Sequence, residues 1–325
     1  MVELIEHPLK ALVTGASGKI GIELVSKLVE LGFSVVALSS RNSFEKMQKV
    51  SFISHDWSQK FEDRLPDVDV IFHLASQTSA YVARQNISKD IETNLLNTVS
   101  ILEAASRFRK APIFIFAGSM TQYGIQASNP INESVPLAPI TFYDTAKISS
   151  EIYIQQFARE NMISKGISLR LANIYGNSKV DSDADRGFLD KSITKAIHGE
   201  EITVYGDGNY VRDYLHVTDA AEAFIKTFFN SWQLSDNVYN IGTGIGTSII
   251  ESLEMIVWKA HQLSGRRSRI VHVDFPEGAY SIEQRNSISD SSRFRNATEW
   301  LPKVKLMYGI EKTLENAWTS ANYST

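Results

Sequence analysis

Apolar runs separated by helix-length segments dominate the first half of the chain. They occupy residues 11–13, 33–38, 68–74, 113–117 and 167–171. Continuous apolar runs of this length are typical of strands that are covered on both faces, as in a parallel sheet. Between the first two runs, Ile20, Leu24, Leu28 and Leu31 recur at helical spacing, and Gly32 marks a helix end. The pattern predicts an α/β fold with a doubly wound parallel sheet.

The alternation becomes irregular after residue 176. An acidic stretch at 181–185 is typical of a loop, and strand and helix signals return at 214–217, 219–229 and 270–273, followed by an amphipathic stretch through Leu314. We therefore predict two domains. The first comprises residues 1–175 plus about 214–243, and the second, smaller and C-terminal, comprises 176–213 plus about 244–325.

Composition narrows the possible partners. The formal net charge is -4 and the basic residues are scattered, so we expect no nucleic-acid partner. No apolar run reaches the roughly twenty residues that a bilayer-spanning helix needs, and the first residues lack a signal-peptide layout, so we expect a cytoplasmic protein without a membrane. The chain has no cysteine, and no His, Asp and Glu cluster has metal-ligand spacing, so we predict no metal.

A glycine turn follows the first predicted strand and opens the first helix. Its sequence is TGASGKIG, from Thr14 to Gly21. Gly15 suits the tight turn, Gly18 a close approach of a pyrophosphate, and Gly21 close packing of helix on sheet. The spacing differs from G-x-G-x-x-G, and a turn without a ligand is the alternative. We assign the first domain to dinucleotide binding, with cofactor contacts from Gly15, Ser17, Gly18, Lys19, Ile20 and Gly21.

The end of the second strand bears on the choice of cofactor. NAD-specific sites place an acidic residue here for the ribose hydroxyls. This chain instead has Ser39, Ser40 and Arg41, so no carboxylate repels a 2′-phosphate, and Arg41 suits one as a bidentate donor. We predict NADP(H) in preference to NAD(H), with contacts from Ser39 and Arg41; an ordinary loop cation is the alternative for Arg41.

Candidate catalytic residues lie between the fourth and fifth apolar runs. Tyr143 and Lys147 are four residues apart, hence on one helix face, where an ammonium favours the phenolate and lowers the pKa of the phenol. Ser119 follows the apolar run that ends at Ala117, where ligands bind in such sheets, and Thr121 adds a second hydroxyl. We predict these four as catalytic residues, with Tyr143 as the acid/base of a hydride transfer.

These motifs together resemble the extended short-chain dehydrogenase/reductases. The resemblance covers the glycine turn, His73 to Gln77, Ser119 to Gly124, Tyr143 with Lys147, and Arg170 to Gly176; it continues through Val204 to Tyr214 and Tyr239 to Gly244. The chain is similar, over nearly its whole length, to the NAD-dependent epimerase/dehydratase family of nucleotide-sugar enzymes.

The resemblance implies further site residues. Asp56 and Trp57 would lie by the adenine, Leu74 and Ala75 along the cofactor channel, and Asn94 would support the site. Asn173 and Arg212 would hold a nucleotide diphosphate, with Val204 and Tyr205 near the base. The Arg-x-Gly-Asp stretch typical of the family reads Phe275 to Gly278 here; Arg285 is a replacement candidate for its arginine, with a surface role as the alternative. The family also implies a homodimer through helices near 91–105 and 149–157.

One difference from the family's sequence pattern limits the reactions that the chain is expected to catalyse. Its 4,6-dehydratases and decarboxylases carry an acidic residue at the position of Thr121, so a dehydratase is disfavoured. We favour an NADP(H)-dependent 4-ketoreductase of a nucleotide-linked 4-keto-6-deoxyhexose. The alternative is a nucleotide-sugar 4-epimerase that retains its cofactor, and a third reading is a non-catalytic NADP(H)-binding sensor. His73 is predicted to be a core histidine whose hydrogen bonds are satisfied.

Overall fold

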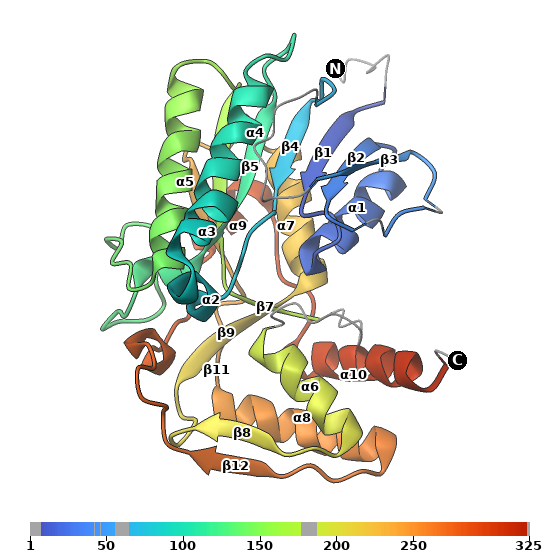
Figure 1. Ribbon diagram of the computed structural model, residues 1–325, viewed down its shortest axis with the longest axis vertical. Helices are drawn as coiled ribbons and strands as arrows, with labels where there is room; N and C mark the ends of the chain where they lie inside the picture. Colours follow the sequence, from blue (N-terminus) through green and yellow to red (C-terminus); the bar gives the residue numbers. More distant parts are fainter. Residues whose placement is uncertain (1–7, 42, 46, 56–64, 177–186, 324–325) are drawn as a thin grey trace.

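The computed structural model describes residues 8–41, 43–45, 47–55, 65–176 and 187–323. Figure 1 shows an α/β part above and a second part below, built from short strands and helices α6, α8 and α10. The chain passes between the two parts more than once, so that β9 and β7 run along their boundary.

A seven-stranded sheet forms the centre of the upper part. Its order is β10-β6-β5-β4-β1-β2-β3, and every neighbouring pair is parallel. The strands are β1 Lys10–Thr14, β2 Ser34–Ser39, β3 Val50–Ser54, β4 Val70–His73, β5 Ile113–Ser119, β6 Lys165–Leu171 and β10 Val238–Ile241. The strand order reverses between β1 and β4, where sheets of this kind open a ligand crevice at their carboxyl ends. The predicted doubly wound sheet is confirmed.

Successive residues of β1 contact opposite layers, which explains its continuous apolar run. Ala11 and Val13 pack with Leu24 and Phe224, whereas Leu12 packs with residues of the other face. Helices α1 (Lys19–Glu30) and α7 (Val217–Phe229) cover the first face. The other face is covered by α4 (Asn97–Ala105) and α5 (Phe142–Arg159), which follow the short elements α2 (Ala80–Gln85), α3 (Ile87–Ile91) and η1 (Glu92–Leu96).

Helix α5 begins where its sequence supplies a complete cap. The Thr141 side chain accepts from the Asp144 N–H at 3.2 Å, and the Asp144 carboxylate accepts from the Thr141 N–H at 3.0 Å. This reciprocal capping box satisfies two N–H groups that have no partner within a helix. It fixes the first turn of α5, which carries Tyr143.

The lower part has its own apolar core. Leu189, Ile193, Val204, Leu253 and Ile310 pack together there. Its elements are β7 Asn173–Tyr175, α6 Phe188–His198, β8 Ile202–Tyr205, β9 Val211–His216, β11 Gly246–Ser248, α8 Ile249–Ser264, β12 Ile270–Val273, η3 Ser281–Gln284 and α10 Leu306–Tyr323. Strands β11, β9 and β7 form one sheet in that order, and β12 pairs with β8.

The structure refines two details of the predicted chain organisation. The strand expected at 214–217 spans 211–216, and α7 starts directly at Val217. Helix α9 (Ser292–Thr298) returns to the upper part, where Phe294 and Trp300 join the core around Leu24. The two-domain division, with 1–175 plus about 214–243 in the first domain, stays a prediction.

Candidate active site

The glycine turn lies at the crevice between β1 and β4. Gly15 has a φ of +65°, and a Cβ there would lie 2.8 Å from the Ala75 backbone nitrogen. A Cβ on Gly21 would overlap the carbonyl oxygens of Gly15 and Ala16. No side chain caps α1 at Gly18, so the first N–H groups of the helix point out of its N-terminus without a capping side chain. This arrangement fits a pyrophosphate.

The end of β4 is held against this turn. The Thr14 hydroxyl accepts from the N–H groups of Leu74 at 3.1 Å and Ala75 at 3.2 Å. The structure thus places Leu74 and Ala75 beside Gly15, as expected for a cofactor channel. Their contact with a cofactor stays a prediction.

The predicted ribose contacts lie at the end of β2. The buried Ser39 hydroxyl hydrogen-bonds the Ser17 hydroxyl and accepts from the Arg41 N–H at 3.4 Å. Arg41 is exposed, so its guanidinium is free to approach a ligand from solvent. Asp56 and Trp57, expected near the adenine, lie outside the described residues.

Ser119, Tyr143 and Lys147 meet where β5 ends beside α5. The Lys147 ammonium donates to the Ala117 carbonyl at 2.9 Å and lies 4.6 Å from the Phe116 ring and 5.8 Å from the Tyr143 ring. The Ser119 and Thr121 hydroxyls are 2.8 Å apart. The structure therefore brings together all four residues that the sequence predicts as catalytic.

Burial controls the charges of this group. It lowers the pKa of Lys147 to about 7, with Glu151 and Asp90 acting in the opposite direction. Burial also raises the pKa of Tyr143 above its ordinary value, with Asp144 adding to the effect, while a hydrogen bond from Ser119 opposes it. Desolvation thus dominates the pKa of Tyr143 in the protein alone, and the expectation that the Lys147 ammonium lowers this pKa stays a prediction.

Gln122 is a site residue that the sequence reasoning missed. Its buried side-chain oxygen accepts from the Ser119 N–H at 2.7 Å, while the Ser119 hydroxyl accepts from the Thr121 N–H at 3.2 Å. This capping box starts the short helix η2 (Met120–Tyr123) and orients Ser119. The Ser-x-x-Gln spacing of Ser119 and Gln122 is the sequence signal that could have predicted this capping box.

Asn94 supports the loop that follows β4. Its side-chain oxygen accepts from the Ser76 hydroxyl at 2.8 Å and the Gln77 N–H at 2.9 Å, and its amide donates to Asp90 at 2.7 Å. It lies in η1, a π-helical turn, a feature that is frequent at functional sites. Asn94 thus contacts the loop beside the crevice.

His73 is a structural residue, as predicted. Its two ring nitrogens hydrogen-bond the hydroxyls of Thr14 at 2.8 Å and Thr98 at 2.9 Å. Burial lowers the pKa of His73 to about 3, with Lys147 adding to the effect, so the ring is neutral at physiological pH.

The predicted substrate residues lie in the lower part and along the boundary. Asn173 opens β7, Val204 is buried in β8, and the exposed Tyr205 ring stacks on Phe275 at 5.6 Å. Arg212 lies in β9 and is buried. The lower part thus presents an exposed aromatic pair and a buried guanidinium, and their contacts with a base and a diphosphate stay predictions.

Arg285 is buried beside Arg212, so its alternative assignment as a surface residue is wrong. Arg212 donates to the carbonyls of Arg285 and of Glu283, the latter at 2.7 Å, and the Arg285 Nε has no hydrogen-bond partner among the described residues. Burial, and then the neighbouring Arg285, lowers the pKa of Arg212 to about 9. Neither arginine forms an ion pair within the described ranges, although the Glu283 carboxylate acts electrostatically on both.

Lys19 has a protein partner that the sequence analysis did not predict. Its ammonium forms an ion pair with the carboxylate of Asp190 in α6, and its contact with a cofactor stays a prediction. Sequence reasoning missed Asp190, because the two residues are 171 positions apart.

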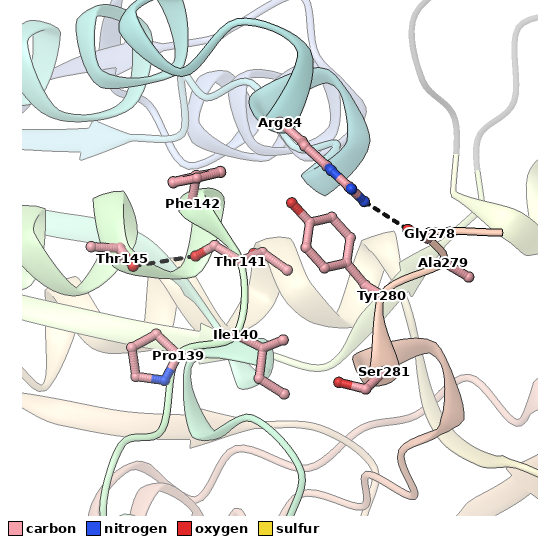
Figure 2. A pocket seen from close by; sticks show the side chains of 10 residues that line it. All are labelled: Arg84, Pro139, Ile140, Thr141, Phe142, Thr145, Gly278, Ala279, Tyr280 and Ser281. Atoms are coloured by element: carbon pink, nitrogen blue, oxygen red, sulfur yellow. Dashed lines mark hydrogen bonds between the residues drawn. The ribbon is translucent and has the colours of Figure 1, made fainter.

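A cavity of about 640 Å³ opens between α2, the N-terminus of α5 and the loop before η3 (Figure 2). Arg84 donates to the Gly278 carbonyl at 2.6 Å, and its guanidinium lies 5.3 Å from the Tyr280 ring. Ser119, Tyr143 and Lys147 do not line this cavity. Arg84 and Tyr280 therefore join α2 to the loop before η3, beside the N-terminus of α5.

The described residues include no cluster of three or more His, Cys, Asp or Glu residues suited to a metal ion. Among the described helices, none has the length and apolar character needed to cross a bilayer.

A glycine turn at the switch point of a parallel sheet, with Ser119, Tyr143 and Lys147 beside it, defines an enzyme of the extended short-chain dehydrogenase/reductase class. The chain belongs to the NAD dependent epimerase/dehydratase family, whose model matches residues 11–242. The predicted family and the prediction of an enzyme are confirmed.

Three UDP-glucose 4-epimerases are similar to this chain over nearly its whole length. The chain is 28% identical to the UDP-glucose 4-epimerase of Mycolicibacterium smegmatis over 324 residues, which cover 94% of this chain and 98% of the relative. The UDP-glucose 4-epimerase of Thermotoga maritima, solved with UDP-glucose, is 30% identical, with a TM-score of 0.80 over 94% of this chain and 98% of that one. The Thermus thermophilus UDP-glucose 4-epimerase, solved with NAD, is 25% identical, with a TM-score of 0.79 over 95% and 99% of the two chains.

Proposed function

We propose that this protein is a nucleotide-sugar 4-epimerase that retains its nicotinamide cofactor. The observation that carries the proposal is the meeting of Ser119, Tyr143 and Lys147 beside the cofactor turn, with a hydroxyl and no carboxylate at Thr121. The named epimerase relatives support it, and they favour this alternative over the 4-ketoreductase that the sequence analysis preferred.

The chain's own residues suit reversible proton transfer at a sugar 4-hydroxyl. The Ser119 hydroxyl orients the sugar oxygen, and the Tyr143 phenolate accepts the hydroxyl proton and later returns it. The chemistry supplied by the bound nicotinamide is reversible hydride transfer. The Lys147 ammonium favours the phenolate, so the phenol and the ammonium must work as a unit.

Arg212 and Arg285 are proposed to hold the substrate diphosphate. Both guanidinium groups are buried without a carboxylate partner in the described chain, and a diphosphate would supply the missing negative charge. Tyr205 offers an exposed ring for the base, and the epimerase relatives make a uridine diphosphate sugar the first substrate to test.

A 4-ketoreductase is the second candidate function, and Arg41 is the observation that favours it. The exposed guanidinium of Arg41 lies shortly after Ser39 in the chain, and the end of β2 carries no acidic residue. The family is NAD-dependent, whereas Arg41 supports a preference for NADP(H), whose reduced form is the usual cellular reductant.

A homodimer is also proposed. Leu96, Ile152 and Tyr153 are exposed apolar residues on η1 and α5, the region from which the family resemblance implies dimer contacts. A cytoplasmic location stays a prediction from the sequence.

The test of the proposed function is incubation of the purified protein with UDP-glucose, followed by separation of the UDP-hexoses. Formation of the C4 epimer without net change in nicotinamide absorbance is expected. Stoichiometric NADPH oxidation with a nucleotide-linked 4-keto-6-deoxysugar would instead establish the reductase.

A further inference from the structure

An ion pair joins the cofactor turn to the lower part of the molecule. Lys19 is the first residue of α1, and its ammonium contacts Oδ2 of Asp190 in the first turn of α6. The other carboxylate oxygen of Asp190 accepts from the Gly176 N–H at 3.0 Å, directly after β7. A single carboxylate thus ties α6 both to the phosphate turn and to the end of β7.

The two partners differ in burial. The Asp190 side chain is fully buried, whereas that of Lys19 is 23% exposed. Within the described residues, Lys19 is the cation that pairs with Asp190, and the nearby His216 has a pKa lowered by burial, so its ring is neutral at physiological pH. The negative charge of Asp190 therefore depends on Lys19 for compensation.

The position of this carboxylate matters for the cofactor. It lies within one lysine side chain of the α1 N–H groups that suit a pyrophosphate. An uncompensated buried carboxylate at that place would repel the phosphates, because like charges interact strongly where water is excluded. Lys19 removes this repulsion only while it stays paired.

We propose that Lys19 neutralises Asp190 beside the cofactor pyrophosphate, which makes cofactor affinity depend on a residue of the lower part, where the predicted substrate residues also lie. Lys19 then acts chiefly through Asp190 rather than as a free phosphate ligand. The inference rests on the proposed function for the identity of the cofactor, but it concerns binding and needs no sugar chemistry.

The experiment is a double-mutant cycle on cofactor binding. Lys19→Met, Asp190→Asn and the double variant are freed of bound cofactor, and dissociation constants for NAD and NADP are measured by calorimetry. Lys19→Met is expected to weaken binding at least about tenfold, whereas the double variant should return to within about threefold of the unmodified protein. Asp190→Asn alone should bind at least as tightly as that protein, because its amide oxygen can still accept from Gly176.

Lys27→Met is the matched control. It removes the other lysine–carboxylate pair of α1, Lys27 with Glu23 at 3.9 Å, on a part of the helix away from the turn. Cofactor affinity should not change.

Two results would overturn the inference. If the double variant binds as weakly as Lys19→Met, then Lys19 contacts the phosphates directly. If Asp190→Asn weakens cofactor binding tenfold, then the Asp190 carboxylate favours cofactor binding instead of opposing it. The Asp190→Asn measurement decides the question even if Lys19→Met fails to fold. Inactivity toward nucleotide sugars would contradict the proposed function and leave these binding results unaffected.

Discussion

At the scale of single residues, the site depends on groups whose charges are set by burial. Lys147 is buried against Phe116 and donates to a backbone carbonyl, and no ion-pair partner balances its ammonium among the described residues. The same desolvation raises the pKa of Tyr143. Proton transfer therefore requires the phenol and the ammonium together.

Tyr143→Phe tests the acid/base assignment. Turnover should fall by roughly 10²–10⁴-fold, the usual contribution of a positioned proton donor, while cofactor affinity stays unchanged. The measurement is kcat with the best nucleotide sugar, alongside calorimetric cofactor binding. Tyr153→Phe, on the exposed side of the same helix, is the control. Full activity of the Tyr143 variant would refute the assignment.

The pKa of Lys147 predicts a pH dependence of stability. Because it is lowered from 10.5 to about 7, the unfolded chain binds more protons than the folded one between these values. This group therefore makes the free energy of unfolding increase with pH in that window, by up to about 1.4 kcal/mol per pH unit.

Urea unfolding of the parent protein and of Lys147→Met between pH 7 and 10 measures this contribution. The variant should show a flatter profile than the parent. Equal slopes for the two proteins would contradict a lowered Lys147 pKa.

Arg41→Ala tests cofactor preference. If Arg41 holds a 2′-phosphate, the variant should lose about tenfold in affinity for NADP(H), roughly 1.4 kcal/mol, and keep its affinity for NAD(H). Binding titrations with both cofactors decide it. An equal loss of affinity for NADP(H) and NAD(H) would show that Arg41 contributes to cofactor binding without recognising the 2′-phosphate.

At the scale of elements, local sequence signals and the structure agree closely. The Thr141 and Asp144 capping box, the glycine turn and the apolar runs of β1, β2, β4, β5 and β6 are all readable from residues near one another in the chain. Strand β3, whose side chains are only partly buried, lacks a continuous apolar run and was not predicted.

Thr141→Ala tests the cap of α5. It should lower the free energy of unfolding by about 1 kcal/mol, since the hydroxyl satisfies an otherwise unpaired N–H. Ser149→Ala, which removes a hydroxyl from the middle of the same helix, should change it by less than about 0.5 kcal/mol. Urea titrations compare the two, and equal effects would argue against a capping role.

At the scale of the whole molecule, the site assembles residues that sequence reasoning cannot pair. The sequence identifies Lys19, Arg212 and Arg285 as candidates, but the Lys19 contact with Asp190 and the burial of Arg285 beside Arg212 follow from how the two parts fold together. The sign of the Tyr143 pKa shift has the same origin, because burial is a property of the assembled fold. Local motifs thus located the catalytic group, and the tertiary structure set its electrostatics.

The proposed homodimer is a prediction at this scale. Light scattering should give about twice the chain mass, and Ile152→Glu, which places a charge at a 62% exposed apolar position on α5, should shift the protein to monomer. Leu301→Glu, at another exposed apolar position, should leave the mass unchanged. A monomeric parent protein would contradict the proposal.

The central claim is that the group formed by Ser119, Tyr143 and Lys147 performs reversible oxidation at C4 of a nucleotide sugar. Its most direct test is to follow UDP-glucose with the purified protein, without added cofactor, by chromatography of the sugar nucleotides. The account predicts conversion to the C4 epimer until equilibrium, and conversion by Tyr143→Phe that is slower by roughly 10²–10⁴-fold. Unchanged UDP-glucose together with NADPH-dependent reduction of a nucleotide-linked 4-keto sugar would contradict it.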